Sequence, residues 1–144
     1  MVRTEAIEFH AERRAADPGG FSPELHAILG AGAFSGLDYV KAQRGVYEFT
    51  QAVRAAFEPV SVLVMPTTPG PASPIGGPGA GIQNTAPFNA TGMPALSLPC
   101  GFTAGGLPVG LQIVGREFDE WTVIRAAHGY EQATDWHKRR PPLG

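Results

Sequence analysis

The stretch Asn84–Gly115 reads NTAPFNATGMPALSLPCGFTAGGLPVGLQIVG and decides the fold. Two short apolar runs in it, Ala95–Cys100 and Val109–Val114, have the length of strands and are bounded by Gly and Pro. In the second run apolar residues alternate with small or polar ones, so one face of that strand is apolar. The Gly-rich connector Gly101–Leu107 fits a hairpin with a longer loop. The stretch therefore predicts two adjacent antiparallel strands inside a buried sheet.

Further elements surround this hairpin. Helices are predicted at 3–16, at 23–31, from Ser35 to Pro59 and at about 120–134. The apolar run Val62–Met65 predicts one more buried strand, bounded by Pro66. The predicted class is therefore α/β, with about four helices and three strands, namely one strand plus the antiparallel hairpin.

Three helix starts carry capping residues. Ser22 precedes a proline at the first helical position, and Asp119 precedes the last predicted helix. Ser35 is followed three residues later by Asp38, which completes a box-like pattern. The apolar residues of that third helix recur every three or four positions, so one face should pack broadly. They are Tyr39, Ala42, Val46, Phe49, Val53 and Ala56.

Several motifs of this chain resemble the amidase signature family. Its C-terminal signature is similar to PFNATGMPALSLPCGF at 87–102, followed by GLPVGLQIVG at 106–115. Upstream of this signature, three further motifs occur in the family's order: Glu5-Ala6, Asp38-Tyr39 and LVMPTTP at 63–69. The resemblance therefore covers nearly the whole chain. Family enzymes hydrolyse amide bonds, are considerably longer, and carry their catalytic residues upstream of these motifs.

The resemblance implies a C-terminal piece of the family's mixed sheet, and we expect residues 1–144 to form a single partial amidase domain. Its expected segments are a helical segment 1–59, a strand 60–66, a Gly/Pro-rich loop 67–94, a β-hairpin 95–115 and a C-terminal helix 119–136.

Composition narrows the class of protein. The formal net charge is −2 and the isoelectric point is near 6.0, which argues against a nucleic-acid partner. No apolar run approaches the ~20 residues of a membrane span, and the N-terminus does not resemble a signal peptide. Cys100 is the only cysteine, which favours a reducing compartment. We therefore expect a cytoplasmic protein without a membrane segment.

The resemblance implies a Ser–Ser–Lys triad in the complete enzymes, with one serine as nucleophile and a lysine as the ultimate base. These residues contain no Ser-Ser pair, and neither Lys41 nor Lys138 has a buried setting in the sequence pattern. No catalytic residue is therefore assigned to this chain. An alternative nucleophile is Cys100, paired with one of the histidines as base. The competing interpretation is structural, because a cysteine at the end of a buried strand packs as a small hydrophobic residue.

No metal or cofactor is expected. Neither an H-E-x-x-H nor a C-x-x-C spacing occurs. Gly76–Gly81 resembles a phosphate loop only in its glycines, because Pro78 removes one backbone donor and no G-K-[ST] follows. A mobile lid fits this segment better.

A substrate-pocket wall is expected at five positions. Thr67, Thr68 and Pro69 follow a predicted strand directly, at the place where ligands gather in α/β sheets. Phe88 and Asn89 match the family's Phe-Asn pair. Each residue also has a purely structural alternative. The threonines can cap backbone groups, Asn89 can hold irregular backbone by hydrogen bonds, and Phe88 can pack in the core.

Two functions remain open. The first is the C-terminal portion of an amide hydrolase, which supplies sheet and pocket walls and meets a small amide substrate only in the complete enzyme. The second is a non-catalytic binding or assembly module derived from an amidase. The expected partner is the missing N-terminal catalytic portion or a second copy, because the edges of so small a sheet recruit other chains.

We expect these 144 residues by themselves to hydrolyse no amide or ester, because they lack the nucleophile and the base. Purified protein is assayed with short aliphatic and aryl amides. Turnover that survives mass-spectrometric proof of purity and disappears in Cys100→Ala would contradict the expectation and establish the thiol as nucleophile.

Overall fold

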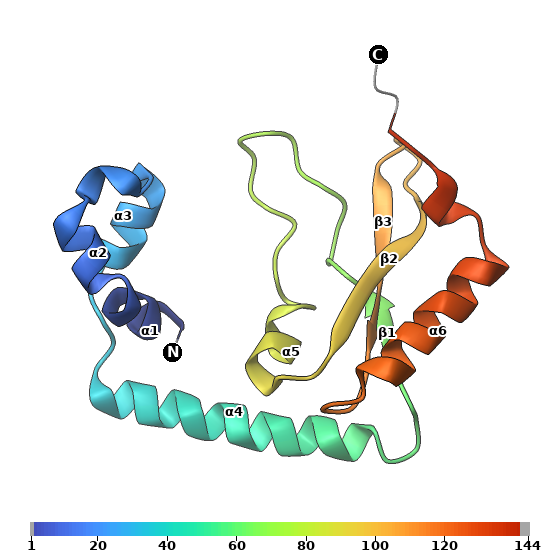
Figure 1. The fold of residues 1–144 in the computed structure, drawn as a ribbon, viewed down its shortest axis with the longest axis horizontal. Coiled ribbons are helices and arrows are strands. Elements are labelled where there is room, and N and C mark those ends of the chain that lie inside the picture. Colours follow the sequence, from blue (N-terminus) through green and yellow to red (C-terminus); the bar gives the residue numbers. More distant parts are fainter. Residues whose placement is uncertain (1, 142–144) are drawn as a thin grey trace. The chain divides into compact units, whose positions relative to one another are not determined.

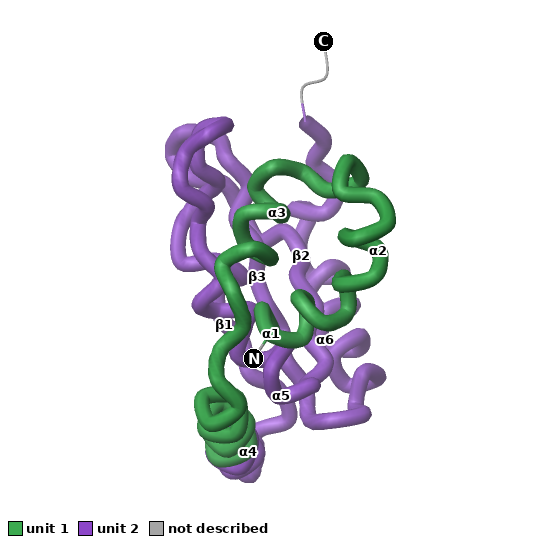
Figure 2. Tube along the Cα trace, turned by 90° about the vertical axis from the view of Figure 1, so that its left-hand side faces the viewer, with its two compact units in different colours: residues 1–48 green, residues 49–144 purple. Residues whose placement is uncertain are grey.

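The structure is a computed structural model that describes residues 2–141 (Figure 1). The chain forms two compact units, Met1–Glu48 and Phe49–Gly144 (Figure 2). The first unit is helical, whereas the second holds the sheet and the candidate site. Whether the units act as one domain stays a prediction.

The helices of the first unit are short and are separated by caps. They are α1 (Val2–Phe9), α2 (Ala11–Ala16), the 3-10 turn η1 (Pro18–Gly20), α3 (Pro23–Gly30) and the first part of α4 (Gly36–Ala56). The single helix expected at 3–16 is wrong, because His10, with ψ of 3°, separates α1 from α2. The cap of α3 is confirmed, since the Leu25 amide donates to the Ser22 hydroxyl at 3.3 Å.

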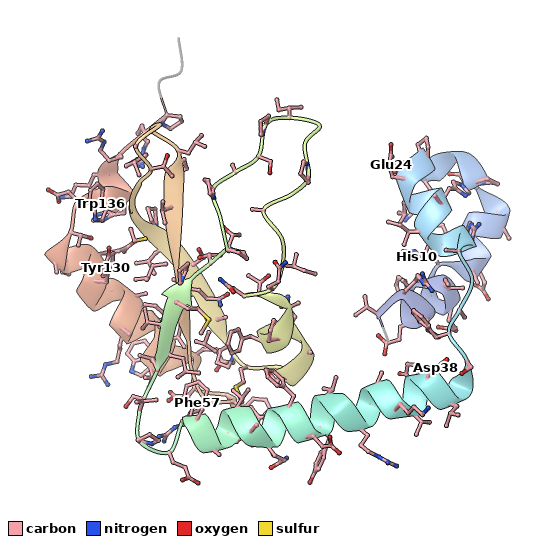
Figure 3. All side chains as sticks on the ribbon, turned by 180° about the vertical axis from the view of Figure 1, so that it is seen from behind. His10, Glu24, Asp38, Phe57, Tyr130 and Trp136 are labelled. Atoms are coloured by element: carbon pink, nitrogen blue, oxygen red, sulfur yellow. The ribbon has the colours of Figure 1, made fainter. Side chains whose placement is uncertain are left out.

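The start of α4 has the box-like cap that the sequence predicts. The Asp38 amide donates to Ser35 Oγ at 3.1 Å, and that hydroxyl donates to Asp38 Oδ2 at 2.6 Å. Asp38 lies at the first turn of the long helix (Figure 3). The broad packing expected of its apolar face is found only in part, because Val53 is buried whereas Phe49 remains 42% exposed.

The sheet of the second unit has the order β1-β3-β2, and both pairs are antiparallel. Its strands are β1 (Leu63–Pro66), β2 (Ala95–Phe102) and β3 (Pro108–Val114). The predicted hairpin is confirmed as β2 and β3, with a connector shortened to 103–107. The register shifts between Pro99 and Gly101, so Cys100 is an extra residue in β2.

The two faces of the sheet carry separate apolar clusters. Successive residues of a strand point to opposite faces, and Val114 and Ile113 accordingly lie in different clusters. Val114 packs in the cluster of Phe57, which follows α4, and Ile113 packs in the cluster that Tyr130 of α6 (Glu120–Ala133) joins (Figure 3). The short helix α5 (Ala86–Thr91) and α6 thus cover opposite sides of the sheet (Figure 1).

Two expectations need correction in this unit. The strand expected to be buried at Val62–Met65 is β1, an edge strand of the sheet, and its Val64 is 55% exposed. The segment 67–94 is not wholly irregular, because it contains α5. Pro87 is tolerated in the first turn of α5, and Gly92, with φ of 71°, ends the helix. Burial of Phe88 and Thr91 outweighs the poor helix propensity of this segment.

The C-terminal helix begins as predicted, since the Thr122 amide donates to the capping Asp119 carboxylate at 3.3 Å. Its buried side is Val123 and Ala127, and the turn η2 (Trp136–Lys138) follows. The Lys138 ammonium donates a hydrogen bond to Asp135 and holds the pKa of that carboxyl below its usual value. The sequence ends in a basic, proline-ended tail, HKRRPP at 137–142. Pro142 at its end lies outside the described residues. Among the described residues, no helix is both long and apolar enough for a membrane span.

Replacing Phe88 by alanine should lower the free energy of unfolding by about 3–5 kcal/mol, because the ring is only 7% exposed within the Val114 cluster. Phe118→Ala is the matched control, since that ring is 94% exposed and its loss should change stability little. Urea unfolding measures both variants. Equal effects of the two substitutions would contradict the buried placement of Phe88 and of α5.

Candidate functional site

Two hydroxyl groups meet above the central strand. The Thr67 amide donates to the Gly110 carbonyl at 2.8 Å and so continues the pairing of β1 with β3. Thr67 Oγ1 lies 2.6 Å from Ser97 Oγ of β2, and the two share a hydrogen bond. Groups from both edge strands therefore touch across β3.

Gly110 makes this contact possible. A Cβ atom at this position would lie 2.7 Å from Thr67 Oγ1, closer than such atoms approach in proteins, and 3.0 Å from Ser97 Oγ, which is also a tight contact. Only a residue without a side chain leaves room for the hydroxyl pair, so steric crowding requires a glycine at position 110.

A buried amide joins the long loop to the same face of the sheet. Gln112 is 3% exposed, lies two residues after Gly110, and therefore shares its face. Its Nε2 donates to the Asn84 carbonyl at 2.8 Å, and Asn84 Nδ2 donates to the Pro66 carbonyl at 2.8 Å. These bonds satisfy groups that burial would otherwise penalise, and they hold residue 84 against the end of β1.

A hollow of about 210 Å³ opens where β1 ends. One wall is the segment Thr68–Ala72, in which Thr68 Oγ1 donates to the Gly70 carbonyl at 2.8 Å. The opposite wall is Pro108–Gly110 at the start of β3, together with Thr103. The hydroxyl pair therefore lies at the edge of a small hollow, because Thr67 precedes one wall and Gly110 belongs to the other.

Among the larger hollows, one of about 360 Å³ lies between Leu96–Pro99 of β2 and residues of α6. Two others have different surroundings. One of about 480 Å³ is lined by Arg54 and Glu117, whose ion pair measures 2.6 Å, and by Arg116, which donates to the Phe57 carbonyl at 2.6 Å. Those charged groups are engaged with the protein itself. The other, of about 650 Å³, lies beside Phe102 and Trp136 near the basic tail.

The structure brings together three of the five positions expected from sequence. Thr67 joins the hydroxyl pair, while Thr68 and Pro69 line the small hollow. Phe88 lies in the core cluster instead, and Asn89 is exposed on α5 with its amide bonded to the Thr85 carbonyl at 3.2 Å. A role in substrate binding stays a prediction for all five.

Sequence analysis missed Ser97, Gln112 and Asn84. The alternation of small or polar residues in Val109–Val114 identifies the polar face of β3, on which Gln112 lies. It does not identify which residues of the neighbouring strands pair with that face. Pairing places Ser97 opposite Gln112, and only the strand order brings Thr67 to the same place.

The thiol and the histidines form no comparable cluster in what the structure describes. Cys100 Sγ donates to the Val109 carbonyl at 3.5 Å, which suits a strand residue with a weak donor. His128 is exposed on α6. Over residues 2–141, no three or more His, Cys, Asp or Glu side chains gather in a way that could hold a metal ion.

The motifs, the sheet and the polar end of β1 define a portion of an amidase fold. The family model described as Amidase matches residues 10–124, so the chain belongs to the amidase family. This confirms the resemblance found in the sequence and the α/β class.

Relatives and solved structures agree with this assignment. The glutamyl-tRNA(Gln) amidotransferase A-subunit of Synechococcus sp. (strain JA-2-3B'a(2-13)) is 48% identical over 137 residues, a match that covers 87% of this chain and 27% of that protein. Putative amidase AmiD of Mycobacterium tuberculosis (strain ATCC 25618 / H37Rv) is 38% identical over 146 residues, with coverage of 93% and 30%. A crystal structure of an amidase superposes with a TM-score of 0.80 at 34% identity, covering 92% of this chain and 33% of that one. The chain thus spans a third or less of the length of these proteins.

Gly110→Ala should lower the free energy of unfolding by about 1–3 kcal/mol, because the added methyl group displaces Thr67 and Ser97. Gly129→Ala is the matched control: nothing lies within 4 Å of its added Cβ atom in α6, so stability should rise by about 0.5–1 kcal/mol. Thermal or urea unfolding measures both. A neutral or stabilising Gly110→Ala would contradict the tight hydroxyl pair.

Proposed function

We propose that this chain is the part of an amide hydrolase that supplies a wall of the substrate pocket and part of the sheet. The observation that carries the proposal is the convergence of Thr67, Ser97 and Gln112 on one face, beside the hollow at Thr68–Ala72. Hydroxyl groups such as those of Thr67 and Ser97 orient an amide by hydrogen bonds, while the buried Gln112 amide holds residue 84 in place. A concave site with few polar groups is typical of small-molecule binding.

The reaction itself is assigned to residues outside this sequence. A serine nucleophile needs a base within hydrogen-bond reach, and these residues contain no Ser-Ser pair. Thr67 and Ser97 hydrogen-bond each other, and within residues 2–141 neither bonds to a lysine or histidine. Their proposed role is to position the substrate. The proposed complete enzyme hydrolyses small amides in the reducing cytoplasm.

Association with the rest of an amidase is part of the proposal. β1 and β2 are the edges of a sheet of three strands, and apolar side chains of this unit remain uncovered. Val64 is 55% exposed, Trp121 67% and Ile124 48%. Unpaired strand edges and apolar surface favour pairing with another chain.

Co-expression with the N-terminal part of an amidase relative tests the function. A stable complex that hydrolyses a small amide, and loses most of its kcat/KM on Gly110→Ala while its assembly is retained, is the expected result. A complex without any amide hydrolysis would favour the non-catalytic assembly module.

The chain by itself should self-associate at high micromolar concentration, in an interface of more than ~1,000 Å². Val64→Lys should weaken association, because a charge on an edge strand opposes pairing. Ile75→Lys is the control, since that side chain is fully exposed in the loop. Sedimentation measures the association. A monomer with a sharp cooperative melt would contradict the prediction and show that these residues form a complete unit.

A further inference from the structure

The long segment between β1 and α5 begins and ends at the same place. It leaves the sheet at Pro66, the last residue of β1, and returns towards α5 at Asn84 (Figure 1). Asn84 Nδ2 donates to the Pro66 carbonyl at 2.8 Å, so a hydrogen bond joins two residues that lie 18 positions apart in the sequence. The segment 68–83 is therefore a loop with closed ends, of the kind called an Ω-loop.

This loop has few anchors of its own. None of its residues is fully buried, and Ile75 and Ile82 are 108% and 70% exposed. Within the described part of the chain, the hydrogen bonds of residues 68–81 stay inside the loop: Thr68 with Gly70, Ser73 with Pro78, and Gly77 with Pro74. Residues without buried side chains gain little in return for their lost chain entropy. The position of the loop therefore depends on how its two ends are held.

The outgoing end is fixed by the sheet. The Thr67 amide donates to the Gly110 carbonyl at 2.8 Å, and Thr67 Oγ1 shares a hydrogen bond of 2.6 Å with Ser97 Oγ. The pairing of β1 with β3 thus continues up to the first residue of the loop.

The returning end is tied to the central strand by Gln112. This side chain is 3% exposed, and its Nε2 donates to the Asn84 carbonyl at 2.8 Å. Residue 84 therefore accepts a bond from β3 through its backbone and donates one to β1 through its side chain. The two bonds act in series. A buried donor that loses its partner is costly, so the link to Gln112 is the firmer of the two.

The burial of α5 is a second anchor near this end. Phe88 is buried in the core and fixes that helix. Before it the chain bends, and two successive amides donate to the Ile82 carbonyl at 3.1 and 2.8 Å, those of Thr85 and Ala86. Asn84 lies inside this bend, whereas Phe88 lies beyond it. The bonds of Asn84 are therefore the ones that can set the position of the bend.

We infer that Gln112 is a positioning residue: through Asn84 it closes the base of the loop 68–83 on the end of β1, and loss of this clasp lets the loop open as a unit while the sheet stays folded. The inference rests on the proposed pocket function and deepens it, because the loop contributes the wall Thr68–Ala72 of the small hollow. Gln112 touches no substrate in this role. It acts by holding that wall opposite Pro108–Gly110.

Hydrogen exchange of the 144-residue chain tests the clasp, read residue by residue by mass spectrometry at low micromolar concentration. The reporters are the bonded amides at the base of the loop, those of Thr67, Thr85 and Ala86. Gln112→Met keeps the length of the side chain and removes its donor, so exchange at the reporters should become about tenfold faster. The amides that pair β2 with β3 should change by less than about twofold, because the sheet stays folded.

Gln83→Met is the matched control. This glutamine is exposed and belongs to the same loop, and its side chain has no hydrogen bond within residues 2–141. Its replacement should leave the three reporters unchanged. An increase in Gln112→Met that is no larger at the reporters than at the β2–β3 amides would mean general destabilisation, and would overturn the inference.

Asn84→Ala tests whether the two bonds act in series. It removes the donor to Pro66 and retains the backbone carbonyl that Gln112 binds. Bonds in series fail together, so this variant should reproduce the effect of Gln112→Met, and the double variant should add nothing to either. Additive effects would show that each bond holds a different element, which contradicts the clasp. Asn84 is partly exposed, so this variant carries the test even if Gln112→Met does not fold.

Kinetics of the co-expressed complex separate the clasp from the proposed function. Gln112→Met and Asn84→Ala should raise KM for a small amide by about tenfold with little change in kcat, because an open wall weakens the binding of substrate and transition state alike. Gln83→Met should leave both constants unchanged. Faster exchange at the reporters without a change in KM would mean that the loop is no pocket wall, so the proposed function fails although Gln112 still holds the loop. Unchanged exchange would overturn the clasp and leave the proposed pocket in place.

Discussion

The second unit depends on the pairing of β3 with a strand on each side. β3 provides backbone partners for both β1 and β2, and its side chains divide the core into two clusters. Val114 is fully buried on one face, and Ile113, 3% exposed, lies on the other. Because buried backbone groups need partners, loss of this pairing would expose both edge strands and both clusters together.

The same pairing builds the candidate site. Antiparallel register places Ser97 beside the polar face of β3, and the position of β1 on the opposite edge supplies Thr67. Gly110 then allows a contact between two strands that are not neighbours in the sheet. Rigid backbone on both sides therefore holds the two hydroxyl groups in place.

Charged residues lie at both ends of the segment 59–115, which itself contains none. Arg54 pairs with Glu117 at 2.6 Å, and Arg116 donates to the carbonyls of Phe57 and Val60 at 2.6 and 3.0 Å. These bonds join the end of α4 to the segment after β3, where cations suit the free carbonyls at the end of a helix. The partly exposed ion pair contributes little stability by itself. Its effect is geometric, because it ties together both ends of the segment that holds the sheet.

The sequence by itself determined the features that arise within a few residues. Caps at Ser22, Ser35 and Asp119 act inside one helical turn, and the two apolar runs of the hairpin are joined by a short Gly-rich connector. The family also followed from the order of motifs, which needs no three-dimensional information. Thr68 and Pro69 line a hollow, as residues that come soon after a strand often do, and their role in a substrate pocket stays a prediction.

Tertiary structure alone decided the rest. Helix α5 forms in a segment rich in proline and glycine, because Phe88 is buried with Phe57, a residue distant in sequence. The meeting of Thr67 with Ser97 requires the order β1-β3-β2, and local patterns carry no information on strand order. Burial in the core and contact across a sheet both depend on residues far apart in the chain, so neither follows from the pattern of either segment taken separately.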